Sequence, residues 1–321
     1  MKLKNMNKKQ KIIAIVATVL VAFVIINFSG GYIAAVTIYS ASFGYRCTTD
    51  ARDAFDIAEF PDLARERHTF TTKQGHTLVG YLYESTDSTV TPKALMIFAH
   101  GLGGGGQTGY MDIFNFFCAQ GYLVFAYDAT ANDESEGEEI GGLPQGFIDL
   151  DYAITYAEAL PEAAELPTVL MGYSWGGLSV ANALNTHPDV EAVASLAGWN
   201  RSMDMIEYRG CQMVGPMGKV LLPFVSAYEF VTYGGKYAFS SAIKGFENSD
   251  CEVLIVHGEL DDTIPIEYGY EAYYAEFSDD DRFTFKKYAD RDHLVMRDED
   301  GNHDMALMAE IAAFFDQTLA N

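Results

Sequence analysis

One serine in this chain has the surroundings that a catalytic nucleophile needs. Ser174 is the central residue of the pentapeptide GYSWG at 172–176, between an apolar run at 167–171 with strand character and an Ala- and Leu-rich run at 178–184 with helical character. A serine on a sharp turn from strand to helix projects its hydroxyl out of the sheet, and glycines flank it because a side chain would clash in so tight a bend. The pattern therefore favours Ser174 as a nucleophile over an ordinary glycine-rich turn.

Residues that can activate a serine follow later in the chain. A serine hydroxyl is a weak nucleophile unless a base accepts its proton and an acid orients that base. One strand-like run leads into GELDDTIP, which contains Asp261 and Asp262, and the next leads into DRDH, which ends at His293. His303 lies further on, just before a predicted final helix. These residue types fit a Ser–His–acid site with two candidates each for the acid and the base.

Taken together, these motifs resemble, in type and in order, those of α/β-hydrolases of the serine esterase/lipase type. The resemblance covers the chain from Arg65 or thereabouts to the C-terminus. In that family a strand commonly ends in HG-x-x-D-x-x-[VI]-P with the aspartate as the triad acid, which implies this role for Asp261, with Asp262 as its rival. The family's histidine follows the last strand, which implies that His293 is the base and that His303 is a polar residue at a helix start.

The same resemblance implies where an oxyanion would be stabilised. One donor is the backbone N–H of Trp175, directly after the proposed nucleophile. The other lies in the loop HGLGGGG at 100–106, which is similar to the family's HG-x-G oxyanion loop, so that the N–H of Leu102 is the expected donor, with that of Gly103 next to it. Such donors contribute about 2.7–4 kcal/mol each in known enzymes. No metal or organic cofactor is implied.

The glycine-rich loop also permits a competing interpretation. Gly101, Gly103 and Gly106 form G-x-G-x-x-G between a strand and a helix, and Asp128 ends the next strand, as in a dinucleotide-binding unit. That interpretation leaves the serine turn and its partners unexplained, whereas the hydrolase resemblance accounts for the glycines too. We therefore expect Asp128 to be a turn residue. The acidic run at 133–139 is expected to be a solvated loop, with metal binding as a minor alternative.

The N-terminus carries a membrane signal. Five lysines precede an uncharged stretch from Ile12 to Tyr45, of which the first seventeen residues are almost wholly apolar. That is close to the minimum length of a spanning helix and longer than most signal-peptide cores. We expect residues 1–45 to be an uncleaved anchor that places the body outside the cytoplasm, with cleavage near Ser40-Ala41-Ser42 and secretion as the alternative. On this basis, removal of residues 1–45 should leave a soluble, active enzyme.

The composition predicts that the chain after the N-terminal segment is an acidic body with enough hydrophobic residues to form a core. Hydrophobic residues make up 49% of the chain, and the formal net charge is −24 although the N-terminus is basic. Such a charge disfavours nucleic acid as a partner. Of the four cysteines, Cys118 and Cys251 are expected in the core, and a bridge between Cys47 and Cys211 is possible but unsupported.

Strands and helices alternate through residues 46–321, which predicts an α/β domain with a mostly parallel sheet covered on both faces. The expected strands lie at 94–100, 122–127, 167–171, 190–196, 251–257 and 282–288, after an edge hairpin at 65–84. Residues 199–248 break the alternation; they are rich in Met and aromatic residues and are expected to form an inserted cap over the site. His100 and His257, at strand ends, are expected to be structural.

The prediction is thus a membrane-anchored serine hydrolase, outside the cytoplasm, that cleaves a carboxylic ester by means of Ser174, His293 and Asp261. Its substrate is a small molecule with an acyl group that suits the apolar cap. A peptidase or amidase on the same triad is the alternative within enzymes. A non-catalytic binding module on the same fold is the alternative of another class, and the presence of all three residue types in order disfavours it.

Overall fold

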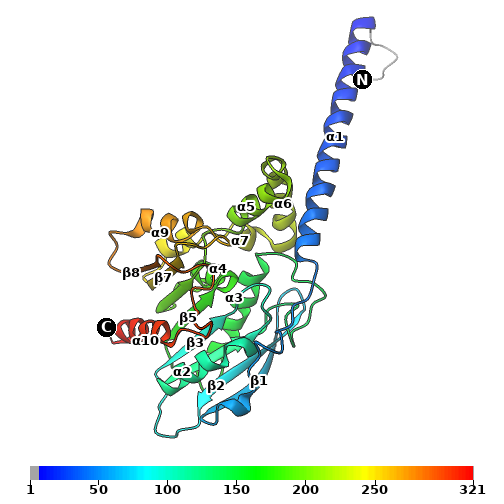
Figure 1. The fold of residues 1–321 in the computed structure, drawn as a ribbon. Coiled ribbons are helices and arrows are strands. Elements are labelled where there is room, and N and C mark those ends of the chain that lie inside the picture. The colour runs from blue at the N-terminus through cyan, green and yellow to red at the C-terminus, as the bar shows by residue number, and fades with distance from the viewer. Residues whose placement is uncertain (1–6, 321) are drawn as a thin grey trace.

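An eight-stranded sheet forms the centre of the structure, a computed structural model that describes residues 7–320 (Figure 1). Its spatial order is β1-β2-β4-β3-β5-β6-β7-β8. The first two strands form an antiparallel hairpin, β2 pairs antiparallel with β4, and all remaining pairs are parallel. The strands are β1 (Leu63–Thr71), β2 (Thr77–Ser85), β3 (Ala94–Ala99), β4 (Tyr122–Tyr127), β5 (Thr168–Tyr173), β6 (Ala192–Leu196), β7 (Glu252–Gly258) and β8 (Phe283–Tyr288).

Helices cover both faces of the sheet, which confirms the predicted α/β architecture. One face packs against α2 (Met111–Ala119) and α10 (Met305–Leu319). The other packs against α3 (Gln145–Glu158), α4 (Trp175–Ala183), α8 (Ala242–Glu247) and α9 (Tyr270–Phe277). The central strands β3 and β4 are buried along their whole length, because both of their faces are covered.

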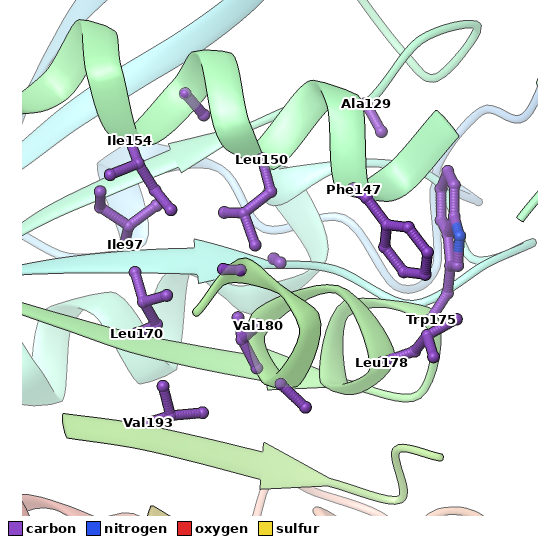
Figure 2. Close-up of a cluster of buried hydrophobic side chains, with 14 of the residues drawn as sticks. Ile97, Ala129, Phe147, Leu150, Ile154, Leu170, Trp175, Leu178, Val180 and Val193 are labelled. Atoms are coloured by element: carbon purple, nitrogen blue, oxygen red, sulfur yellow. The ribbon is translucent and has the colours of Figure 1, made fainter. Parts of the chain in front are cut away.

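The packing on the α3 and α4 side fixes the strand that leads to Ser174. Figure 2 shows this cluster, in which alternate strand residues point toward the two helices. The strand members are Ile97, Leu170 and Val193, and the helix members include Leu150, Ile154, Leu178 and Val180. All seven are buried, with exposed fractions of 3% or less. The carboxyl ends of β3, β5, β7 and β8 lie at one edge of the sheet, where the predicted site residues follow them.

The segment predicted to be a cap lies between β6 and β7. It contains α5 (Ser202–Val214), α6 (Met217–Tyr233) and α7 (Gly235–Ala238), followed by α8. In Figure 1, α5 and α6 form a pair of helices that stands above the carboxyl edge of the sheet. Its role as a cap over bound substrate stays a prediction.

The N-terminal segment is one unbroken helix, α1 (Lys8–Phe43), which Gly30 and Gly31 do not interrupt. By length and composition it could cross a membrane, with a mean hydropathy of 2.7 over eighteen residues. Lys2 and Lys4 lie outside the described residues. The N-terminal part of α1 extends away from the body, whereas its last turns pack against α6 (Figure 1).

Candidate active site

The turn that carries Ser174 has the geometry that its sequence suggests. Ser174 follows β5 and precedes α4, with φ +56° and ψ −115°, a backbone conformation that costs a non-glycine residue about 1–3 kcal/mol. A Cβ at Gly176 would overlap the carbonyl oxygen of Ala99, and one at Gly172 would overlap the backbone of Gly176. Both glycines are therefore needed because the turn presses against neighbouring backbone, and the buried sheet holds Ser174 in its strained conformation.

Three of the predicted side chains meet at this turn. The Ser174 hydroxyl lies 2.8 Å from Nε2 of His293, and Nδ1 of the same ring lies 2.8 Å from Oδ2 of Asp261. Because a carboxylate accepts hydrogen bonds, Nδ1 carries the ring proton, which leaves Nε2 free to accept the serine proton. The arrangement is a Ser–His–Asp hydrogen-bonded chain assembled from residues far apart in the sequence.

Asp261, rather than Asp262, is the aspartate in contact with the imidazole. The Asp261 carboxylate is buried and also accepts hydrogen bonds from the backbone N–H groups of Thr263 (2.9 Å) and Ile264 (2.7 Å). Burial would raise the pKa of Asp261, but hydrogen bonds from His257 and His293 outweigh it and hold this pKa below its ordinary value. Asp262 is exposed to solvent. The charged form of Asp261 is thus the stable one at neutral pH.

The second candidate base, His303, lies apart from the hydrogen-bonded Ser174, His293 and Asp261. His303 is buried and donates from Nδ1 to the carboxylate of Asp112, at 2.8 Å. His293, in contrast, is held by Tyr173, whose hydroxyl donates to the His293 carbonyl at 3.0 Å and whose ring lies against the imidazole.

Sequence reasoning missed a second imidazole beside the acid. Nε2 of His257, at the end of β7, lies 2.9 Å from the carbonyl oxygen of Ile264 and 3.3 Å from Oδ2 of Asp261. His257, on β7, therefore holds the loop that carries the acid, and it precedes Asp261 by four positions in the sequence. The strand-end position in HG-x-x-D was the available signal, and it indicated only a structural role.

The two expected oxyanion donors occupy different surroundings. The indole of Trp175 is buried and donates from Nε1 to the carbonyl of Leu143, so only its backbone N–H faces the turn. Within the described residues, no protein acceptor binds the N–H of Leu102 or of Trp175. The loop of Leu102 is held by His100, which accepts at Nε2 from the N–H of Ala129. Whether the two N–H groups act as an oxyanion hole stays a prediction.

The acidic residues near this loop hold its backbone. The buried carboxylate of Asp128 accepts from the N–H groups of Gln107 (2.9 Å) and Glu134 (3.2 Å). The Asp133 carboxylate accepts from the N–H of Gly106 at 2.9 Å. Asp128 thus holds the turn between β3 and α2 through backbone hydrogen bonds. In a dinucleotide-binding site the corresponding acidic residue would instead bind the ribose. Residues 7–320 contain no cluster of three or more side chains suited to a metal ion.

The cysteines form no bridge in the structure. Cys118 and Cys251 are buried, as predicted, and Cys47 and Cys211 are both free.

Two hollows meet at the Ser–His pair. The larger, of about 460 Å³, is lined mostly by apolar side chains of α1, α5 and α6. The smaller, of about 250 Å³, is more polar and includes Asp53, Arg297 and His303. Three residues line both of them, namely Leu102, Ser174 and His293. An acyl group and a leaving group could therefore lie on opposite sides of the serine hydroxyl.

Comparisons of sequence match part of this chain to known proteins. A family model described as serine aminopeptidase, S33, matches residues 90–229. The quorum-quenching protein AidA of Acinetobacter baumannii is 29% identical over 141 residues, which cover 42% of this chain and 46% of that protein, so the match spans less than half of the relative.

Solved structures of similar shape include two esterases. An esterase from Pyrococcus furiosus superposes with a TM-score of 0.63 at 14% identity, over 86% of this chain and 97% of that one. Acetyl xylan esterase 1 from Thermoanaerobacterium superposes with a TM-score of 0.58 at 15% identity, over 90% and 94%. At such identities the likeness shows the fold alone.

Proposed function

We propose that this chain, which has the α/β-hydrolase fold, is a serine hydrolase that cleaves a carboxylic ester through an acyl-enzyme. The observation that carries the proposal is the Ser174–His293–Asp261 chain, with both hydrogen bonds at 2.8 Å and with the hydroxyl at the junction of two hollows.

In the proposed first step, Ser174 Oγ attacks the ester carbonyl carbon while His293 Nε2 accepts the serine proton. The buried, ionised Asp261 stabilises the imidazolium that forms. The N–H groups of Leu102 and Trp175 stabilise the negative charge on the carbonyl oxygen. The ester C–O bond then breaks, and the proton passes from His293 to the departing alcohol. Water activated by the same histidine hydrolyses the acyl-enzyme and releases the acid.

The lining of the larger hollow supports an ester of a neutral acyl group. An aminopeptidase must bind a free ammonium group on the acyl side of the scissile bond, and a carboxylate usually supplies its counter-charge. Among the described residues that line the larger hollow, none is acidic. The permanently charged side chain in this lining is Arg209, which is positive. An ammonium group would be poorly accommodated there, so an ester is favoured over an aminoacyl amide.

We also propose that α1 anchors the enzyme with its catalytic body outside the cytoplasm. The apolar helix and the N-terminal lysines support this orientation, since lysines are retained on the cytoplasmic side.

A substrate comparison tests the proposed reaction. The full-length protein in detergent micelles is assayed with p-nitrophenyl acyl esters and with aminoacyl p-nitroanilides. We expect turnover of the esters, loss of that turnover in Ser174→Ala, and no measurable release from the anilides. Faster cleavage of an anilide than of any ester would instead establish a peptidase or amidase.

A further inference from the structure

The larger hollow beside Ser174 is built in part by the N-terminal helix. Ala35, Ile38 and Tyr39 of α1 line it together with Leu221, Leu222 and Val225 of α6. The α1 residues belong to one helix face, since three- and four-residue spacings bring side chains together. Ala35 and Tyr39 are buried in the same hydrophobic cluster as the body, and the Tyr39 hydroxyl donates to Glu229 of α6 at 2.6 Å. The end of α1 is therefore a structural wall of the proposed acyl site.

This finding bears on an expectation drawn from the sequence. Removal of residues 1–45 was expected to leave a soluble, active enzyme, because no catalytic group lies there, and this stays a prediction. The structure shows that this removal would open the larger hollow along one side and expose the side chains that α1 covers.

The wall continues into the part of α1 that is apolar enough to cross a membrane. The Phe224 ring of α6 packs against Phe28, with ring centroids 5.1 Å apart, and against Gly31. α6 thus follows α1 from the hollow toward the apolar stretch that begins at Ile12. If α1 spans a bilayer, α6 packs against the part of α1 that emerges from it. α6 then lies at the membrane surface.

The connection between α5 and α6 carries exposed apolar side chains. Met213, Met217 and Val220 have exposed fractions of 63%, 53% and 59%, and Met213 also lines the hollow. The exposed Lys219 beside them pairs with Glu207, and its long stem allows the ammonium group to reach lipid headgroups. Exposed apolar side chains next to a candidate spanning helix are suited to the acyl region of a bilayer.

We propose that the substrate is a long-chain acyl ester dissolved in the membrane, and that its acyl chain enters the larger hollow, which α1, α5 and α6 line, from the membrane side. This inference rests on the proposed ester hydrolysis. The ester group then lies at Ser174, and the alcohol portion lies in the smaller, more polar hollow, which holds Arg297 and His303. The chemical class of substrate is thus a membrane lipid or another ester with a long acyl chain.

The test uses full-length protein in phosphatidylcholine vesicles, with p-nitrophenyl acetate and p-nitrophenyl palmitate as substrates. Ala35→Trp and Leu222→Trp fill the hollow from α1 and from α6, two of the helices that line it. Ile33→Trp is the matched control, because Ile33 lies on the same helix with 64% of its surface exposed. We expect each filling variant to lower palmitate turnover by about tenfold or more relative to acetate turnover, and the control to leave this ratio unchanged.

Acetate turnover reports whether each variant is folded, so a variant that loses both activities is replaced by its counterpart on the other helix. Unchanged palmitate-to-acetate ratios in both filling variants would overturn the inference. The inference would also be overturned if palmitate ester were hydrolysed at the same rate in the same vesicles as the protein and in separate vesicles. Failure of the wild type on both esters would overturn the proposed function itself, which keeps the two outcomes distinct.

Discussion

The buried carboxylate of Asp261 accepts hydrogen bonds from two backbone N–H groups and from the imidazole of His293. Its neighbour Asp262 has the same chemistry but points into solvent. The difference between them is one of position, because a carboxylate orients the imidazole only when it contacts Nδ1.

We therefore expect Asp261→Asn to lower kcat by about 10⁴-fold, as loss of the corresponding aspartate does in known triads. Asp262→Asn is the matched control and should stay close to the wild type. Steady-state hydrolysis of a p-nitrophenyl ester measures both. The reverse ranking would transfer the role of acid to Asp262.

The sequence motifs predicted the meeting of Ser174, His293 and Asp261 because each follows a strand whose carboxyl end lies at the same edge of the sheet. They did not predict the contact of His257 with Asp261. Asp261 lies four positions after His257, on the irregular loop that follows β7, and neither hydropathy nor spacing determines how such a loop folds back on its strand.

At the scale of elements, α1 and α6 are joined by a buried polar contact. Glu229 accepts hydrogen bonds from Tyr39 at 2.6 Å and from Ser202 at 3.2 Å. Burial raises the pKa of Glu229 to about 7, against the lowering effect of these two donors. Since the folded pKa lies above the unfolded one, the contribution of Glu229 to stability is full below the unfolded pKa of 4.5 and is lost as the pH rises through about 7.

The protein should accordingly lose stability between pH 5 and pH 8, by roughly 3 kcal/mol at most from this group. Glu229→Gln imitates the protonated side chain and should remove this loss, with a higher melting temperature at pH 8 and little change at pH 5. Glu207→Gln, on the neighbouring helix α5, should keep the wild-type pH dependence. Thermal unfolding in detergent micelles gives the comparison, and an unaltered pH dependence in Glu229→Gln would contradict it.

The strands were predictable to within a few residues because buried parallel strands are continuous apolar runs. The short helix α9 was not, since its sequence YEAYYAEF mixes apolar and acidic residues over only eight positions. The packing of α1 against α6 was also not predictable. In a helix that is apolar all round, no hydropathy pattern separates a face that contacts protein from one that contacts lipid.

At the scale of the whole molecule, a basic N-terminus and an apolar helix precede an acidic body. In a bacterial host the full-length protein should therefore sediment with membranes and resist carbonate extraction. Protease added outside spheroplasts should digest the body, because the lysines keep the N-terminus inside. Mature protein that begins near Phe43 and is free in the medium would instead establish a cleaved signal, and it would lack the α1 wall of the larger hollow.

The central claim is that Ser174 is the nucleophile of the proposed hydrolase, and covalent labelling tests it most directly. The full-length protein is treated with a fluorophosphonate, and the adduct is located by peptide mass spectrometry. We predict one adduct, on Ser174, that is absent in Ser174→Ala. The adduct should be retained in the control Ser179→Ala, because the Ser179 hydroxyl donates to the Trp175 carbonyl within α4. Labelling at another residue that persists in folded Ser174→Ala, or no labelling of protein that hydrolyses esters, would contradict the account.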